Sequence, residues 1–479
     1  MKKIDLSLAV SLALLPWVAM AAPEPQAVEL LGKVSRTLGA DTLKSVEFSG
    51  AGHSYTLGQG GSVTAPWPKF NDVSYQRTVS FEPWASKLER VRTQGEHPPR
   101  GGGGQPLVGE QRQTQIVAAG SPAATSLPDD LAVTLPQAFL KAALAATDTS
   151  LKSGSRNGKK YQVIEFTAAN KATTRGWIDS DNLVERVETT IDHNVIGDTP
   201  VEATFSTYRD FGGLKFPTHI VQAQGGHPVL DLNVANVRAN VTAEFSPAPA
   251  APAPAAVTTE KLGEGVYLIT GGYAAVAVEF KDHVTVIEGG QNDQRSSAVI
   301  AEITRLIPGK PITELVNTHA HFDHLGGVRA YVAEGATIVT HKSNTAYYKK
   351  LWANPHSLVP DRLAQHPQPA KFKEVDAKLV LKEGDQVVEL YHLEEFGHHD
   401  GMLVAWLPRQ KILVEADAFN PPAAPLTQTP AVVSTFNASL LANIERLGLD
   451  VQRIVPVHLP ADNRKVTLAE LQVAAGKVR

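Results

Sequence analysis

The pattern of apolar and polar positions divides the chain into two parts of different character. In the first part, short segments alternate apolar and polar residues with a period of two and are separated by frequent turns. This pattern predicts antiparallel strands with one buried face. The segments that show it are residues 43–48, 75–81, 88–91, 162–166, 175–178, 183–191, 203–208, 218–221 and 230–241. Helical spacing at 28–38 and 135–146 predicts two helices, so we expect a mainly antiparallel β domain.

In the second part the pattern changes, and expected strands alternate with expected helices. The expected strands are 266–269, 274–280, 284–288, 315–317, 337–340, 378–380, 387–393, 402–407 and 411–415, and the expected helices are 297–306, 328–332, 434–447 and 467–475. The last helix begins with a capping box formed by Thr467 and Glu470, and Gly448 follows the preceding helix as its stop signal. Interspersed strands and helices of this kind predict a layered α/β domain.

A segment rich in Pro and Ala separates the two parts. Residues 246–256 contain nothing to bury and favour an extended, semi-rigid linker. We therefore divide the chain of 479 residues into a leader at 1–21, a β-rich domain at 22–245, the linker at 246–256 and an α/β domain at 257–479. The glycine run at 101–104 is interpreted as a flexible loop, because no strand-to-helix context supports phosphate binding.

The N-terminus has the pattern of a secretory leader. Lys2 and Lys3 precede an apolar stretch at 6–20, which Pro16 interrupts, and cleavage is expected after Ala21. The stretch is shorter than the roughly 18 residues that a spanning helix needs. We expect a periplasmic or secreted protein with no transmembrane segment after cleavage.

Charge and cysteine content narrow the function classes. The formal net charge of −4 provides no basic field for a phosphate backbone, so nucleic acid is not an expected partner and a small-molecule substrate is. The chain has no cysteine. Disulfides and a thiolate nucleophile are therefore excluded, and every metal ligand must be His, Asp or Glu.

Several potential metal ligands lie close together in one short segment that follows an apolar run. His319, His321, Asp323 and His324 stand within six residues, and a pair of glycines follows soon after. Two histidines two positions apart cannot share one face of a helix, but at the end of a strand they can converge on one point while Asp323 and His324 turn to a neighbouring point. The segment therefore predicts two adjacent metal sites, and its ligand types suit zinc and also manganese or iron. The alternative, a His-rich surface loop, explains this density less well.

The His-x-His-x-Asp-His pattern of this segment resembles the signature of the metallo-β-lactamase superfamily, and the resemblance extends over 257–479. It implies a four-layered αββα sandwich with two metal ions at one edge of its sheets. Through residues 176–179 and 211–217, the first part resembles the curved-sheet domains of periplasmic lipoprotein carriers. That second resemblance suggests a lipid or envelope partner for the β-rich domain.

The superfamily resemblance also implies three further ligands, each near the end of a strand. Residues 396–401 match its Gly-His-x-x-Gly turn, which favours His398 as a ligand over the neighbouring His399. Asp417 falls where a bridging carboxylate lies, and many lactamases carry Cys or Ser there. The implied ligands are His319, His321 and His398 for one ion, Asp323, His324 and His458 for the other, and Asp417 between them.

These residues predict a hydrolase. Two divalent ions, Zn²⁺ by expectation with Mn²⁺ or Fe²⁺ as alternatives, would supply hydroxide to attack an ester, lactone, thioester or amide, and Asp323 could relay a proton. The alternatives are a true β-lactamase and a non-hydrolytic role, either iron-dependent or lipid-binding. Residues 351–372 form an insertion that is either a lid over the metals or an outward excursion. No ligand role is assigned to the other histidines, which are His53, His97, His193, His219, His227, His283, His341, His356, His366 and His392.

Overall fold

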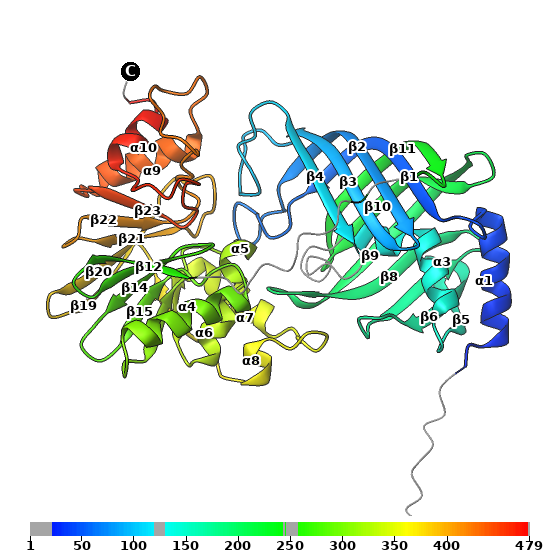
Figure 1. Cartoon of the computed structure of the whole chain (residues 1–479), viewed down its shortest axis with the longest axis horizontal. Helices are drawn as coiled ribbons and strands as arrows, with labels where there is room; N and C mark the ends of the chain where they lie inside the picture. The colour runs from blue at the N-terminus through cyan, green and yellow to red at the C-terminus, as the bar shows by residue number, and fades with distance from the viewer. Residues whose placement is uncertain (1–21, 119–129, 243–244, 246–256, 478–479) are drawn as a thin grey trace, which may run out of the picture.

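The computed structural model describes residues 22–118, 130–242, 245 and 257–477 (Figure 1). The predicted leader at 1–21 and the predicted linker at 246–256 lie outside the described residues. None of the helices in the described ranges is long and apolar enough to cross a membrane.

The first domain is built on one antiparallel sheet, as the alternating pattern predicts. Its strands run in the order β4-β3-β2-β1-β11-β10-β9-β8-β7-β6-β5. Their bounds are β1 Ser45–Tyr55, β2 Lys69–Phe81, β3 Trp84–Gln94, β4 Gln111–Ala118, β5 Ser150–Arg156, β6 Lys159–Thr167, β7 Thr173–Ile178, β8 Val184–His193, β9 Gly197–Asp210, β10 Lys215–Gln224 and β11 His227–Ala239. Sequence analysis missed β4 and β5. Both are edge strands, and edge strands keep polar residues where central strands alternate.

Three helices pack on this sheet: α1 (Pro25–Leu38), α2 (Asp130–Thr134) and α3 (Pro136–Ala145). One core joins them to the strands, with Leu31 of α1 and Phe139 of α3 in the same buried cluster as Phe216 of β10. Helix α1 ends where Gly39 takes a left-handed conformation, with φ of 68°. The two predicted helices are therefore present. They lie at one end of the sheet (Figure 1), and their apolar side chains join its core.

The second domain contains two sheets. The strands of the first are β12 Thr258–Gly263, β13 Val266–Thr270, β14 Ala275–Glu279, β15 Val284–Ile287, β16 Ile312–Val316, β17 Thr337–His341 and β18 Lys371–Val375. Those of the second are β19 Lys378–Glu383, β20 Gln386–His392, β21 Leu403–Leu407, β22 Ile412–Glu415 and β23 Arg453–Pro456. Each sheet follows chain order, and the strands from β15 to β18 run parallel. The unpredicted β12 and β18 are again edge strands with exposed polar residues.

The helices of this domain are α4 Asp293–Leu306, α5 Phe322–Leu325, α6 Val328–Ala333, α7 Lys342–Trp352, α8 Arg362–Gln365, α9 Thr435–Arg446 and α10 Leu468–Ala474. Only one half of the predicted capping box is formed: the Thr467 side chain accepts from the Glu470 backbone N–H, whereas the Glu470 carboxylate accepts from Arg464. One buried cluster joins the two sheets, with Val276 on the first and Val414 on the second. Separate clusters pack α4, α6 and α7 on the first sheet and α9 and α10 on the second. The expected α/β domain is confirmed.

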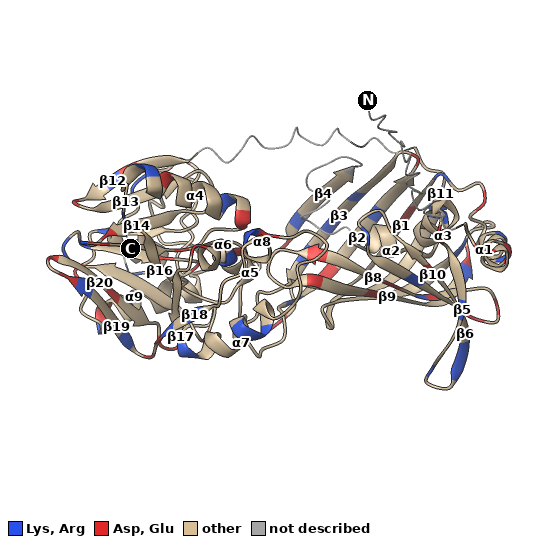
Figure 2. Ribbon diagram, turned by 90° about the horizontal axis from the view of Figure 1, so that it is seen from below, with Lys and Arg blue, Asp and Glu red and all other residues tan. Residues whose placement is uncertain are grey.

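The two domains contact each other through the β8–β9 hairpin (Figure 2). The Asp198 carboxylate accepts from the backbone N–H groups of Ser357 and Leu358 at 3.0 and 3.1 Å. The Asn354 amide donates to the Ile196 carbonyl at 3.0 Å. The predicted insertion at 351–372 thus binds the first domain, and the loop found over the metal-ligand candidates is a different one, described below.

Candidate metal centre

The His-rich segment is a buried turn between a strand and a short helix. Strand β16 ends at Val316, and α5 begins at Phe322 with His321 as its N-cap. The Asn317 amide closes the turn by donating to the His324 carbonyl at 3.0 Å, and the Tyr348 hydroxyl donates to Asn317. His319 and His324 have no exposed surface. The histidines are therefore fixed in place by the fold.

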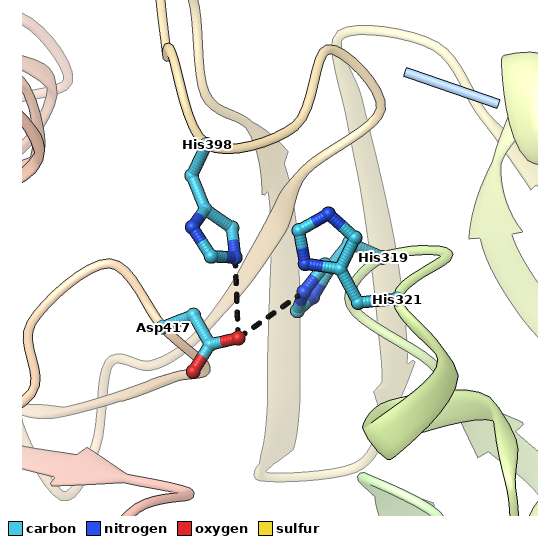
Figure 3. A group of neighbouring side chains, drawn as sticks. All are labelled: His319, His321, His398 and Asp417. Carbon is cyan, nitrogen blue, oxygen red and sulfur yellow. Dashed lines mark hydrogen bonds and ion pairs between the residues drawn. The ribbon is translucent and has the colours of Figure 1, made fainter. Parts of the chain in front are cut away.

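Four of the predicted ligands form a first group: His319, His321, His398 and Asp417 (Figure 3). Each offers one ligand atom within 4.8 Å of the others. The His398 Nε2 lies 3.1 Å from the Asp417 Oδ2, and the His319 Nε2 lies 3.5 Å from the same oxygen. The neighbouring His399 is not in the group, and its Nδ1 accepts from the Gly401 N–H at 2.9 Å. The geometry therefore favours His398 of the two candidates.

A second group consists of Asp323, His324, Asp417 and His458. The His458 Nε2 lies 2.7 Å from the Asp417 Oδ1, and the His324 Nε2 lies 3.2 Å from the Asp417 Oδ2. Asp417 therefore belongs to both groups, where sequence analysis places the bridging carboxylate. The structure brings all seven predicted side chains together, and their role as ligands stays a prediction.

Hydrogen bonds on the outer side of three of the rings decide which nitrogen faces the centre. The His324 Nδ1 donates to the Glu288 Oε2 at 2.8 Å, and the His321 Nε2 donates to the Gly60 carbonyl at 2.9 Å. The His319 Nδ1 lies 3.0 Å from the Thr318 hydroxyl. The ring nitrogens left over, such as the His319 Nε2 and the His321 Nδ1, are buried without a hydrogen-bond partner.

Buried polar atoms without partners are rare in proteins and call for an explanation. Here the unpartnered nitrogens converge with carboxylate oxygens, and this donor set of imidazole and carboxylate is the one that zinc and similar ions bind. The residues therefore fit a divalent metal ion on the chemistry of their donor atoms.

The electrostatics of the centre favour cations. Burial acts to lower the pKa of His324, but the adjacent carboxylates Asp323, Asp417 and Glu288 outweigh it and raise that pKa well above its usual value. Burial acts to raise the pKa of Asp417, yet the surrounding imidazoles hold it well below the usual range. Asp417 and Glu288 also have left-handed backbones, with φ of 59° and 71°, and such strain concentrates at functional sites.

Sequence analysis missed four residues around the centre: Gln59, Gly60, Tyr273 and Glu288. Glu288 shows the same signal as Asp417, an acid at the end of an apolar strand, and could have been found by it. The Tyr273 hydroxyl donates to the Asp323 Oδ2 at 3.0 Å, and Tyr273 follows two glycines between β13 and β14. Gln59 and Gly60 belong to the first domain and carry no local signal.

The glycine run at 101–104 also lies at this site. A Cβ added to Gly102 would stand 2.0 Å from the Gln59 Oε1 and 3.0 Å from the His321 ring. The Gly101 N–H donates to the Gly397 carbonyl, next to His398, at 3.0 Å. The prediction of a loop is confirmed, but the run also packs against the candidate ligands, where a side chain would not fit.

A family model described as the metallo-beta-lactamase superfamily matches residues 269–458. A linear primary-alkylsulfatase of a Pseudomonas species is 39% identical over 57 residues, which span 12% of this chain and only 11% of that relative.

Two solved metallo-beta-lactamase structures each cover 46% of this chain. The enzyme from Pontibacter korlensis is 19% identical with a TM-score of 0.35, and it covers 46% of this chain and 97% of its own. The enzyme from Hirschia baltica is 18% identical with a TM-score of 0.34, and the match covers 46% of this chain and 96% of that enzyme. The family match begins in β13 and ends at His458, the last candidate ligand. Within the second domain, residues 269–458 thus match the metallo-beta-lactamase superfamily.

Proposed function

We propose that the chain is an exported hydrolase that uses two divalent metal ions, zinc by expectation, held in a four-layered αββα sandwich. The observation that carries the proposal is the pair of side-chain groups that share Asp417. His319, His321 and His398 would hold one ion, and Asp323, His324 and His458 the other, with Asp417 between them. Two bound ions would lower the pKa of a water molecule and polarise the bond under attack.

The side chains around Asp323 define how the chain itself would assist. Asp323 and His458 are the exposed members of the centre, with 25% and 27% of their side-chain surface accessible, so a substrate would approach over them. Burial is the main cause that raises the pKa of Tyr273 far above its usual value, and the negative charge of Asp323 is the second. Tyr273 therefore keeps its proton and can donate a hydrogen bond. Asp323 remains a carboxylate that can accept a proton during hydrolysis.

Substrate class follows from the surroundings of the centre. A cavity of about 300 Å³ touches the centre through His321 and is lined by residues of both domains, including Trp67, Tyr347 and Lys350. We propose that it holds the part of a substrate that extends away from Asp323 and His458. Aromatic surface next to one ammonium group suits a small substrate with an apolar part and an anionic part. We propose an ester, lactone, thioester or amide.

Two other hydrolytic substrates are favoured by a specific observation each. The similarity to an alkylsulfatase adds a primary alkyl sulfate as a candidate. The superfamily adds a β-lactam, although Asp417 stands where many lactamases carry Cys or Ser. An iron-dependent, non-hydrolytic role has no such observation in its favour.

The test is turnover of a substrate panel by the full chain. The panel contains a nitrophenyl ester, a lactone, a thioester, an amide, nitrocefin and an alkyl sulfate. We expect hydrolysis of at least one substrate, and at least a hundredfold loss in Asp323→Ala and His321→Ala. His366→Ala changes an exposed histidine outside both groups and serves as the control. Full activity in either site variant, or after exhaustive chelation, would refute the mechanism.

The first domain has no established role of its own. In the described part of the domain, the apolar side chains of α1 and α3 are buried against the sheet, and a lipid or envelope partner for this domain stays a prediction. The contacts at the metal centre support a different role, developed next. The periplasmic or secreted location stays a prediction.

A further inference from the structure

A loop of the first domain reaches the metal centre. This loop, residues 56–68, connects β1 to β2 and is closed by a hydrogen bond from the Thr56 N–H to the Pro68 carbonyl at 3.0 Å. Its Gln59 is 8% exposed. We propose that Gln59 and Gly60 are positioning residues that the first domain supplies to the metal centre of the second, an inference that rests on the proposed function.

Gln59 orients Asp323 by direct contact. The Gln59 Nε2 donates to the Asp323 Oδ1 at 2.7 Å, and the Tyr273 hydroxyl donates to the Oδ2 at 3.0 Å. With one donor on each oxygen, the plane of the carboxylate is fixed. A hydrogen bond to a carboxylate is stronger than one between neutral groups, so Gln59 also stabilises the ionised form that a cation requires.

Gly60 sets the tautomer of His321. A carbonyl oxygen only accepts, so the contact of 2.9 Å with the His321 Nε2 places the ring proton on that nitrogen. The Nδ1 is then left with a free lone pair, and it has no hydrogen-bond partner. One metal-ligand candidate of each group is therefore held by this loop.

The loop fits the centre closely. The Phe322 N–H donates to the Gly58 carbonyl at 3.3 Å, and the Gly102 N–H donates to the Gln59 carbonyl at 2.9 Å. Gly58 has φ of 66°, and a Cβ there would lie 2.0 Å from the Phe322 ring. On the other side, the Asp400 N–H donates to the Gly61 carbonyl at 2.8 Å. The loop therefore bridges the turn that carries His321 and the turn that carries His398.

The experiment compares zinc affinity in Gln59→Leu and in the parent chain, by competition with a chromophoric chelator. Leucine has similar bulk and cannot donate to Asp323. We expect about a tenfold loss of affinity for at least one of two zinc ions, a typical cost of losing a partner of a metal ligand. Gln137→Leu is the matched control, because Gln137 is a buried glutamine of the same domain that donates to the Lys215 carbonyl, far along the chain from the loop.

A second variant guards against misfolding of the first. Gln59→Ala removes the same donor to the Asp323 Oδ1 with a smaller side chain, so we expect the same loss of zinc affinity. Thermal unfolding of each variant without metal reports folding separately. Parental zinc affinity in both folded variants would overturn the inference and leave the proposed function standing. A parent chain that binds no zinc would overturn both.

Discussion

Glu288 offers a sharp test of how the second group of side chains is organised. Its Oε1 accepts from the Thr318 N–H at 2.8 Å, and its Oε2 accepts from the His324 Nδ1 at 2.8 Å. Both contacts are buried, so Glu288→Gln keeps the shape but converts one acceptor oxygen into an NH₂ donor. Whichever way the amide turns, it faces one N–H group with another donor.

The least costly relief is a change of tautomer at His324. If the new amide donates to the Nδ1, the ring proton must move to the Nε2. That nitrogen lies 3.2 Å from Asp417 and is the one predicted to bind metal. A partner of this kind is typically worth 10- to 100-fold in metal affinity, or about 1.4 to 2.7 kcal/mol. We expect Glu288→Gln to lose zinc affinity by that factor at one of two sites.

The assay is a zinc titration of the refolded, metal-free chain against a competing chelator. Glu314→Gln is the matched control, because Glu314 accepts from Thr285 at 3.0 Å on the neighbouring strand and contacts no candidate ligand. Two zinc ions bound with parental affinity by Glu288→Gln would refute the tautomer argument.

Three further predictions concern pH, the domain contact and metal removal. Burial, and to a smaller extent the charge of His356, lowers the pKa of His193 to about 4. The free energy of unfolding should therefore fall by up to about 3 kcal/mol as pH falls from 6.5 to 4. His193→Asn should remove this fall in urea unfolding, and an equal dependence on pH in the variant and the parent chain would contradict the prediction. Asp198→Ala removes the acceptor for Ser357 and Leu358 and should destabilise the chain by about 1–3 kcal/mol, measured the same way; an unchanged midpoint would speak against this contact. Zinc at 100 times its dissociation constant should stabilise the metal-free chain by about 2.7 kcal/mol in thermal unfolding, and no shift would argue against a folded-state site.

Site residues could be predicted from the sequence where they lie close together in the chain or end an apolar strand. Residues brought to the site from another domain could not be predicted. His319 to His324 lie in one hexapeptide, and Asp417 and His458 each end an apolar strand, so pattern and resemblance together point to them. Gln59 precedes Asp323 by 264 positions. Nothing in its own neighbourhood distinguishes it from any other polar loop residue, because its role depends on how two domains dock.

The same physical reason explains which strands could be predicted. Central strands such as β15 bury every residue and show as apolar runs. Edge strands such as β5 and β18 expose most of theirs, and their polar sequences resemble loops. The sequence of the glycine run at 101–104 likewise predicts only a loop. Its glycines are needed because the Gln59 and His321 side chains lie beside Gly102, which the local sequence does not show.

The central claim is that one chain holds two metal ions through a shared Asp417. Elemental analysis of the full chain, loaded with zinc and dialysed, tests it most directly. The account predicts two zinc ions per parent chain and fewer than one in a folded Asp417→Ala variant, since that carboxylate belongs to both groups. One ion or none in the parent chain, or two in the variant, would contradict it.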